Sequence, residues 1–271
     1  MGDAHRYDVV DGRVVTHSLE AHIVDHCNLR CWQCCSLSPF HDPKVTEPEV
    51  LAEDLRLARQ AVSPSIFKLV GGEPLLHPRL LECLEVARES QIAPTISLTT
   101  NGILLQRQDD ALWRLLDHMT LSIYPKPELS EATLGWIRSQ ADRFGVELNV
   151  KRQDRFEVIH RAEPRADPEA TAQIFDRCWL RRRCHTVREG KFFTCTVPQH
   201  FHNFWHGDPP YAELDGFPLT PRPGLADALR RYLERAEPLT ACARCYGGTG
   251  VLEPHRQLTR AEVEMRAAGP M

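Results

Sequence analysis

Short apolar runs alternate with amphipathic helical patterns from about residue 19 to residue 151. The apolar runs have the length of buried strands and lie near 21–24, 65–70, 95–99, 119–124 and 146–150. Between them, apolar residues recur at the spacing of one helix face, near 46–62, 78–87, 111–116 and 130–144. This alternation predicts parallel βαβ units, in which each strand is followed by a helix that packs on the sheet. We expect a sixth strand near Phe156–His160.

Local signals predict where several of these helices begin and end. The sequence Thr46-Glu47-Pro48-Glu49 has the pattern of a capping box that opens the first helix. Pro78 suits the first turn of the second helix, and Gly145 suits the C-terminal cap of the helix near 130–144. Cys83 falls on the apolar stripe of the second helix, so we expect it to be a small buried residue.

Three closely spaced cysteines, Cys27, Cys31 and Cys34, follow the first predicted strand. Four thiolates would complete a zinc site or occupy every iron of a cubane cluster. Three thiolates on one loop suggest instead a cluster with one iron left open for a ligand that is not protein. From these residues alone, a structural zinc site remains the alternative.

Two further loops follow predicted strands. Gly71-Gly72-Glu73-Pro74 comes after the second strand, and Thr99-Thr100-Asn101-Gly102 comes after the third. Paired glycines allow the backbone to approach a ligand closely, and an adjacent carboxylate can hold an ammonium group. All three loops therefore lie at the C-terminal ends of parallel strands, which is the edge where α/β sheets and barrels bind ligands.

The Cys27/Cys31/Cys34 loop, followed by Gly71-Gly72-Glu73-Pro74 and Thr100-Asn101-Gly102, resembles the radical S-adenosylmethionine (SAM) superfamily. The resemblance implies a partial (β/α)6 barrel that is open along one side. It implies a [4Fe-4S] cluster on the three cysteines, with the fourth iron bound by the amino and carboxylate groups of SAM. One electron from the cluster would cleave SAM to methionine and a 5′-deoxyadenosyl radical, which abstracts hydrogen from the substrate.

By the same resemblance, particular residues would bind SAM. Glu73 and the backbone of Gly71 and Gly72 would contact the methionine ammonium group. The residues expected near the ribose and carboxylate are Thr100, Asn101 and Ser122. The superfamily usually has an aromatic residue just before the third cysteine, beside the adenine. Here Gln33 occupies that position and Trp32 is one residue earlier, so the residue that packs against adenine is not identified.

Five more cysteines follow residue 175: Cys178, Cys184, Cys195, Cys242 and Cys245. Glu189-Gly190-Lys191 predicts a hairpin turn between Cys184–Val187 and Phe192–Cys195. The spacing of Cys178, Gly190 and Cys195, followed by an apolar helix at Leu225–Leu233, resembles the short "twitch" form of the SPASM extension. We therefore expect a partial barrel over 1–175 and a twitch domain with a tail over 176–271.

The twitch resemblance implies one auxiliary [4Fe-4S] cluster, because no cysteine follows Cys245. Its implied ligands are Cys178, Cys195, Cys242 and Cys245, although four cysteines suit zinc equally well. Cys184 is left over. It could replace Cys178 as a ligand, it could be an inert buried thiol, or it could face the active site and donate a hydrogen atom. Cys35 is a weaker candidate for the same donor role.

The connection over 196–224 has no clear periodicity and is rich in aromatic residues and prolines. Its aromatic residues could stack on a sugar or cyclitol ring, or they could form a local core. They are Phe201, Phe204, Trp205, Tyr211 and Phe217. The histidines at 200, 202 and 206 lack metal-site spacing, and we interpret them as surface or substrate-binding residues.

Composition excludes some classes of function. Of the 271 residues, 26% are charged and 42% are hydrophobic, as in an ordinary globular protein. The net charge of −4 gives no basis for general nucleic-acid binding, and no apolar stretch reaches the ~20 residues needed to span a bilayer. Arg181-Arg182-Arg183 is interpreted as a solvated basic turn. Ten cysteines without a signal peptide predict metal ligands in the reducing cytoplasm rather than disulfides.

The combined features resemble twitch enzymes that modify carbohydrate or aminocyclitol natural products, including those that invert a sugar carbon in antibiotics of the hygromycin B type. In such an epimerase, a protein thiol returns hydrogen to the substrate radical, and the auxiliary cluster helps to restore the thiol. Cys184 favours this reaction. A dehydrogenase would instead form a ketone, passing an electron to the auxiliary cluster and a proton to a base such as Lys151 or Arg152. Either enzyme would need a low-potential flavodoxin or ferredoxin as electron donor.

Two further hypotheses stay open at this stage. One is a peptide maturase, which would oxidise or cross-link a precursor peptide. The other is a zinc-binding interaction module without catalytic activity, which would carry the same cysteines but no sulfide.

Overall fold

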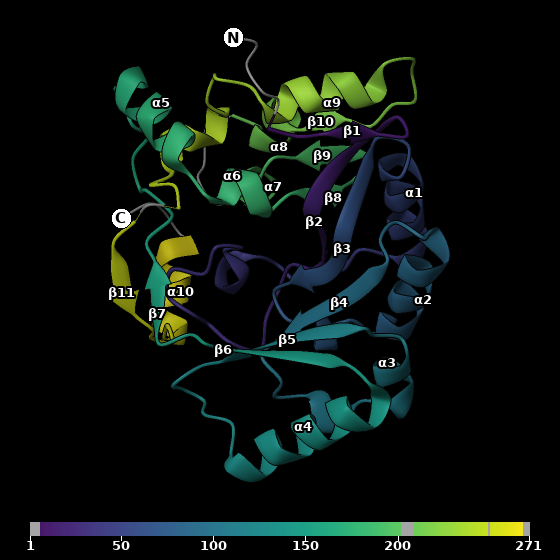
Figure 1. Cartoon of the computed structure of the whole chain (residues 1–271). Coiled ribbons are helices and arrows are strands. Elements are labelled where there is room, and N and C mark those ends of the chain that lie inside the picture. The colour runs from purple at the N-terminus through teal and green to yellow at the C-terminus, as the bar shows by residue number, and fades with distance from the viewer. Residues whose placement is uncertain (1–5, 202–208, 249, 268–271) are drawn as a thin grey trace.

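The computed structural model describes residues 6–201, 209–248 and 250–267. A parallel sheet forms its centre (Figure 1), and its strands are neighbours in chain order. They are β2 (Arg13–Val24), β3 (Val62–Gly71), β4 (Thr95–Thr100), β5 (His118–Ile123) and β6 (Glu147–Arg152). This arrangement confirms the expected α/β fold.

Four helices connect these strands and cover one face of the sheet (Figure 1). They are α1 (Pro48–Ala58), α2 (Leu80–Ser90), α3 (Asp110–Arg114) and α4 (Glu131–Phe144). Alternation along each strand explains the packing, because successive side chains point to opposite faces. On β2, for example, Leu19, Ala21 and Ile23 are buried in the core that contains the helix residues. The residues between them point to the other side, which we call the inner face of the sheet.

Residues after position 175 extend the same sheet beyond β2. The order is β10 (Phe217–Pro218), β9 (Lys191–Phe193), β8 (Thr186–Arg188) and then β2, while β1 (Val9–Val10) pairs separately with β2. The predicted β8–β9 hairpin is confirmed. Its turn residues Glu189 and Gly190 have φ of 50° and 73°, as a two-residue hairpin turn requires. Their N–H groups donate to the carboxylate of Asp54 on α1, which fixes the hairpin against the first helix.

The expectation of a sixth barrel strand at 156–160 is wrong. The strand there is β7 (Arg155–Glu157), and it pairs antiparallel with β11 (Leu252–Pro254) in a separate two-stranded sheet. The reason is that β11, from the C-terminal part of the chain, supplies the backbone hydrogen bonds of β7. Strand β7 therefore does not pair with β6 in the main sheet. A short apolar run does not reveal which strand it pairs with.

Two predicted helix starts are also wrong. Helix α1 has Glu47 at its N-cap, without a side-chain cap hydrogen bond. The hydroxyl of Thr46 donates instead to the carbonyl of His22 at 3.3 Å, so it is not available for a capping box. Helix α2 begins at Leu80 rather than Pro78. Gly145 does cap α4, with φ of 69°.

The remaining described helices lie mainly in the second half of the chain. They are α5 (Pro168–Arg177), α6 (Leu180–Arg183), α7 (Val197–His200), α8 (Tyr211–Asp215), α9 (Leu225–Leu233) and α10 (Arg260–Ala267). Short 3-10 turns occur at Ser38–Phe40, Pro74–Leu76, Leu105–Arg107 and Thr240–Arg244. Helix α9 has the predicted bounds, and Cys83 is fully buried on α2 as predicted. None of the helices in the described part of the chain has both the length and the apolar character needed to cross a membrane.

The connection over 196–224 contains more structure than its sequence predicted. Phe201 and Tyr211 are buried in a second hydrophobic cluster, with ring centroids 5.5 Å apart, which favours the local-core interpretation for these two. His200 is fully buried rather than on the surface, and its Nε2 lies 3.0 Å from Nδ1 of His22. The predictions for Phe204, Trp205, His202 and His206 lie outside the described residues.

The interpretation of Arg181-Arg182-Arg183 as a solvated turn is wrong for Arg181, which is buried. Its guanidinium lies 3.7 Å from the ring centroid of Phe175 and donates to the carbonyl of Arg235 at 2.8 Å. Carbonyl groups from distant parts of the chain therefore replace water around this charge.

Candidate active site

The three predicted loops meet at the C-terminal edge of the parallel sheet. The N–H of Gly72 donates to the carbonyl of Val24 at 2.7 Å, just before the cysteine loop. The side-chain amide of Asn101 donates to Oδ1 of Asn28 at 2.6 Å and lies 4.0 Å from Sγ of Cys27. The loops are thus joined by direct hydrogen bonds.

The paired glycines are required by this close approach. A Cβ atom on Gly71, whose φ is 139°, would lie 2.2 Å from the carbonyl oxygen of Val24. A Cβ atom on Gly72 would lie 1.9 Å from the carbonyl oxygen of His26. The glycines therefore allow the second loop to pack directly on the backbone that leads to Cys27.

Glu73 is buried and fully hydrogen-bonded at the centre of these loops. Its Oε1 accepts from the hydroxyl of Thr100 at 2.6 Å and from the N–H of Leu75 at 3.0 Å. Its Oε2 accepts from the N–H of Asn101 at 2.8 Å. Burial raises the pKa of Glu73 to about 7, although these donors act in the opposite direction. A cation bound nearby would stabilise the ionised carboxylate and lower that pKa again.

The three cysteines of the first loop lie beside one another and are largely shielded from water. Burial raises the pKa of Cys27 well above that of a free thiol and the pKa of Cys31 to about 12, and the neighbouring thiols add to both shifts. The N–H of Leu29 donates to Sγ of Cys27 at 3.3 Å. Such a donor set fits an iron-sulfur cluster, in which each thiolate binds a separate iron and loses its proton on binding. Within the described residues, no His, Cys, Asp and Glu side chains form a group placed to hold a single metal ion.

Ser122 and Tyr124 lie at the end of β5, near the cysteine loop. Ser122 is buried and shares a side-chain hydrogen bond with Tyr124. Burial raises the pKa of the Tyr124 hydroxyl, and the three thiols of the loop raise it further. The ring of Tyr124 stacks on Phe156, with centroids 6.0 Å apart. The contact between these two rings was not predicted, because Phe156 was expected inside a barrel strand.

A row of polar residues that was not predicted from the sequence crosses the inner face of the sheet. Nζ of Lys68 on β3 lies 3.0 Å from Oε1 of Glu20 on β2, with side chains 24% and 13% exposed. The hydroxyl of Ser97 on β4 lies 2.8 Å from Nδ1 of His118 on β5. The register places Lys68 beside both Glu20 and Ser97. The signal was present in the sequence, because Glu20, Lys68 and Ser97 each lie between two buried apolar residues of their strand.

Four of the later cysteines line one apolar cavity: Cys178, Cys195, Cys242 and Cys245. The N–H of Gly247 donates to Sγ of Cys245 at 3.1 Å, and the N–H of Gly248 donates to Sγ of Cys178 at 3.2 Å. Four thiols that line one cavity, with backbone donors to sulfur, fit an iron-sulfur cluster, in which each thiolate binds a separate iron. These are the four ligands that the twitch resemblance implies.

Cys184 does not line that cavity. It lies close enough to Glu20, Cys35 and Lys68 for their charges to affect its pKa, which burial raises well above the ordinary value. Cys178 contributes to the same pKa shift, and Cys184 packs against the second hydrophobic cluster together with Cys35. The chain beside Cys184 is bonded to β2, because the N–H of Glu20 donates to the carbonyl of His185 at 2.9 Å. Cys184 thus lies near both the polar row and the late cysteine Cys178.

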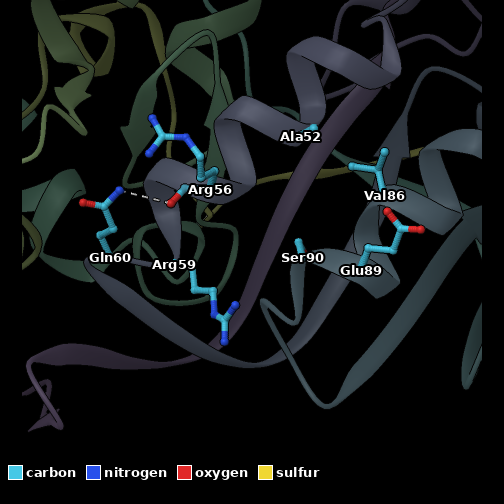
Figure 2. A pocket seen from close by; sticks show the side chains of 7 residues that line it. All are labelled: Ala52, Arg56, Arg59, Gln60, Val86, Glu89 and Ser90. Atoms are coloured by element: carbon cyan, nitrogen blue, oxygen red, sulfur yellow. Dashed lines mark hydrogen bonds between the residues drawn. The ribbon is translucent and has the colours of Figure 1, made fainter.

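The surface on the other side of the sheet contains no part of these motifs. A shallow hollow lies there between α1 and α2 (Figure 2). It is lined by Ala52, Arg56, Arg59, Gln60, Val86, Glu89 and Ser90. The motif loops and the polar row are all on the opposite side or at the strand ends.

The sequence model of the radical SAM superfamily matches residues 22–124. This segment contains the three motif loops together with Ser122 and Tyr124. The match supports the radical SAM superfamily. It also supports an enzyme that uses SAM and a [4Fe-4S] cluster.

Relatives of known name match part of the chain. GTP 3′,8-cyclase of Chlorobaculum tepidum is 32% identical over 168 residues, which is 60% of this chain and 45% of that protein. GTP 3′,8-cyclase of Streptomyces coelicolor is 36% identical over 118 residues, which is 41% of this chain and 34% of that protein. The chain thus spans less than half the length of these relatives.

A solved structure is similar over most of the chain. The crystal structure of BtrN in complex with AdoMet and 2-DOIA aligns with a TM-score of 0.50 and 15% identity, over 85% of this chain and 92% of that one. At this identity the similarity concerns the fold alone. It is consistent with a partial radical SAM barrel.

Proposed function

We propose that this protein is a twitch-type radical SAM epimerase, which inverts a carbinol carbon of a sugar or aminocyclitol intermediate of antibiotic biosynthesis. The observation that carries the proposal is the position of the Cys184 thiol. Cys184 adjoins β2, because the N–H of Glu20 donates to the carbonyl of the next residue, His185, at 2.9 Å, and Cys184 does not line the cavity of the four late cysteines. The proposed units are the partial barrel over 1–175 and the twitch domain with its tail over 176–271. The proposed auxiliary [4Fe-4S] cluster binds to Cys178, Cys195, Cys242 and Cys245.

When bound, SAM and the cluster on Cys27, Cys31 and Cys34 supply the 5′-deoxyadenosyl radical that removes a hydrogen atom from the carbinol carbon. The thiol of Cys184 then gives its hydrogen atom to the opposite side of that carbon. An S–H bond breaks and a C–H bond forms, which leaves a sulfur radical. One electron from a flavodoxin or ferredoxin, together with one proton, restores the thiol. The raised pKa of Cys184 keeps the sulfur protonated, as a hydrogen donor requires.

The inner face suits a small hydroxylated substrate. Glu20, Lys68, Ser97 and His118 present both donors and acceptors along one short polar row. Carboxylates such as Glu20 also suit an amino group on a cyclitol ring. For SAM, we propose contacts from the Gly71-Gly72 backbone and Glu73, and from Thr100, Asn101 and Ser122.

A second candidate is a nucleotide cyclase, because the named relatives with 32% and 36% identity are GTP 3′,8-cyclases. Their matched regions cover less than half of those proteins. A dehydrogenase with Lys151 as base is a third candidate. Lys151 on β6 is exposed and pairs in register with Ser122 on β5, so it is within reach of the inner face.

The test uses the anaerobically reconstituted full chain with SAM, a reductant and D₂O as solvent. A panel of aminocyclitols and amino sugars is offered, with GTP as a separate reaction. An epimerase gives an inverted product with one deuterium at the inverted carbon, because the thiol exchanges with solvent. Cys184→Ala should still form 5′-deoxyadenosine but no inverted product, while Cys35→Ala, which removes the weaker donor candidate, should form both.

Several results would refute the epimerase. Full turnover by Cys184→Ala would exclude the thiol mechanism. A ketone product would favour the dehydrogenase, and a cyclised product from GTP would favour the cyclase. Purified protein that contains zinc but no sulfide would contradict the iron-sulfur assignment altogether.

A further inference from the structure

The C-terminal part of the chain returns to the cysteine loop and lies along it. We call residues 252–258 the strap. Its backbone is bonded to the loop on both sides of Cys31: the N–H of Trp32 donates to the carbonyl of Arg256 at 2.9 Å, and the N–H of Leu258 donates to the carbonyl of Arg30 at 2.7 Å. The strap is thus held in register with the loop, like an added strand.

Two side chains of the strap reach the sulfur of Cys31. Nε2 of His255 lies 3.2 Å from this Sγ, and Nε2 of Gln257 donates to it at 3.3 Å. Oε1 of Gln257 accepts from the N–H of Arg30 at 2.6 Å, which fixes the orientation of the amide. The two N–H groups come from alternate residues of an extended segment, so both point to the same side of the strap.

The surroundings of His255 identify the nitrogen that carries its proton. Nδ1 of His255 is buried and has no hydrogen-bond partner among the described residues. Nε2 of His255 also lies 3.1 Å from Nε2 of Gln257, whose two hydrogens can go to Cys31 at 3.3 Å and to the carbonyl of Lys126 at 3.2 Å. With the His255 proton on Nε2, no buried N–H of the imidazole is then left without an acceptor. A thiolate at Cys31 has no hydrogen to give, and the contact is then a donation from Nε2–H to sulfur.

Aromatic rings hold the imidazole in this position. Tyr124 and Phe156 lie 5.1 and 5.3 Å from the ring of His255, measured between centroids. These two rings are stacked on each other. The imidazole therefore has little freedom to rotate away from Cys31.

From this geometry we propose that the strap tunes the cluster at the first cysteine loop, with His255 and Gln257 as donors to the Cys31 thiolate that make the cluster easier to reduce. The inference rests on the part of the proposed function that assigns a cluster to Cys27, Cys31 and Cys34. Hydrogen bonds to a cluster sulfur stabilise the more negative, reduced state and so raise the reduction potential. The strap would thus help a flavodoxin or ferredoxin to deliver its electron.

The test is a redox titration of the reconstituted full chain, followed by electron paramagnetic resonance with mediator dyes and without substrate. The signal that changes on addition of SAM identifies the cluster of the first loop. His255→Phe keeps a ring between Tyr124 and Phe156 but removes the N–H donor. At the midpoint potential of the parent protein, the ratio of reduced to oxidised cluster in this variant should fall roughly threefold to tenfold, because one charge-assisted hydrogen bond is lost. His255→Gln, which restores a donor, should recover part of the ratio.

Glu253→Gln is the matched control. Oε2 of Glu253 accepts from Nε1 of Trp32 at 2.7 Å and from Nε2 of Gln33 at 3.3 Å, so this residue ties the strap to the loop without touching Cys31. Loss of its negative charge can only favour the reduced cluster. An unchanged potential in His255→Phe with the iron and sulfide of the parent would overturn the proposal, and so would an equal fall in Glu253→Gln. If His255→Phe loses iron, the reduction potential of Gln257→Leu is measured instead. A lower potential would then support the proposal, and an unchanged potential would overturn it. A parent protein without iron and sulfide would refute the proposed function rather than this inference.

Discussion

A buried ion pair joins the β8–β9 hairpin to the start of the cysteine loop, and its removal tests the reasoning about the site. Arg188 on β8 makes two hydrogen bonds of 2.8 Å to the carboxylate of Asp25, which precedes Cys27 by two residues. The two side chains are only 7% and 6% exposed. The Arg188→Met variant leaves the Asp25 carboxylate buried without a counter-charge.

The expected cost follows from that burial. Removing one partner of a buried pair typically destabilises a protein by about 3–5 kcal/mol, because the remaining charge is uncompensated. The Arg188 guanidinium holds the pKa of Asp25 below its usual range. In the parent protein the pair therefore stabilises the fold above the unfolded-state pKa of ~3.9, and this contribution is lost as the pH falls through the lower folded-state pKa. In Arg188→Met, desolvation raises the pKa of Asp25 instead. The loss in free energy of unfolding relative to the parent protein should therefore become smaller as the solution is acidified towards that raised pKa.

The assay is urea unfolding of the anaerobic protein at several pH values, with iron content measured in parallel. Arg79→Met is the control, because Arg79 pairs with three exposed glutamates at the surface and should contribute far less. The double variant Asp25→Asn with Arg188→Met should recover part of the loss, because no buried charge is left. The role of this ion pair would be refuted if Arg188→Met lost less than about 1 kcal/mol of unfolding free energy, or if the loss became larger at low pH.

Three further predictions concern the motif loops and the inner face. SAM affinity should rise about tenfold from pH 6 to pH 8 as Glu73, whose pKa is about 7, becomes ionised, and calorimetry should find no such rise in Glu73→Gln. Gly72→Ala should lose the iron of the first cluster, measured by iron assay, because its Cβ would lie 1.9 Å from the carbonyl oxygen of His26; unchanged iron would contradict the packing argument. Lys68→Met removes a charged hydrogen-bond donor that we propose for the substrate, so the KM for substrate should rise at least tenfold, while 5′-deoxyadenosine formation without substrate should not change.

The sequence predicted those features that depend on local periodicity. The five parallel strands, the α4 cap at Gly145 and the hairpin turn at Glu189-Gly190 follow from patterns within a few residues. The meeting of the three loops at one sheet edge also followed, because parallel strands share the direction of their C-terminal ends.

Features that depend on distant partners could not be predicted in this way. Strand β7 pairs with β11 almost a hundred residues later, and Arg181 is solvated by carbonyl groups of other elements. The strap is the clearest example. His255 and Gln257 follow no motif, and only the backbone bonds to the cysteine loop bring them to Cys31. The polar row containing Lys68 was predictable only in part. The alternation of polar and apolar residues along each strand was visible in the sequence, but the strand register that brings the polar residues together was not.

The β8–β9 hairpin links the parts of the proposed mechanism. Cys184 precedes β8 by two residues, Cys195 follows β9 by two residues, and Arg188 between them is clamped to Asp25. One rigid unit therefore sets the position of the donor thiol relative to both cysteine sites. A hydrogen donor must lie on the opposite side of the substrate from the abstracting radical, so its placement must be precise. Loosening the clamp should then reduce inverted product more than 5′-deoxyadenosine, even where both clusters are retained.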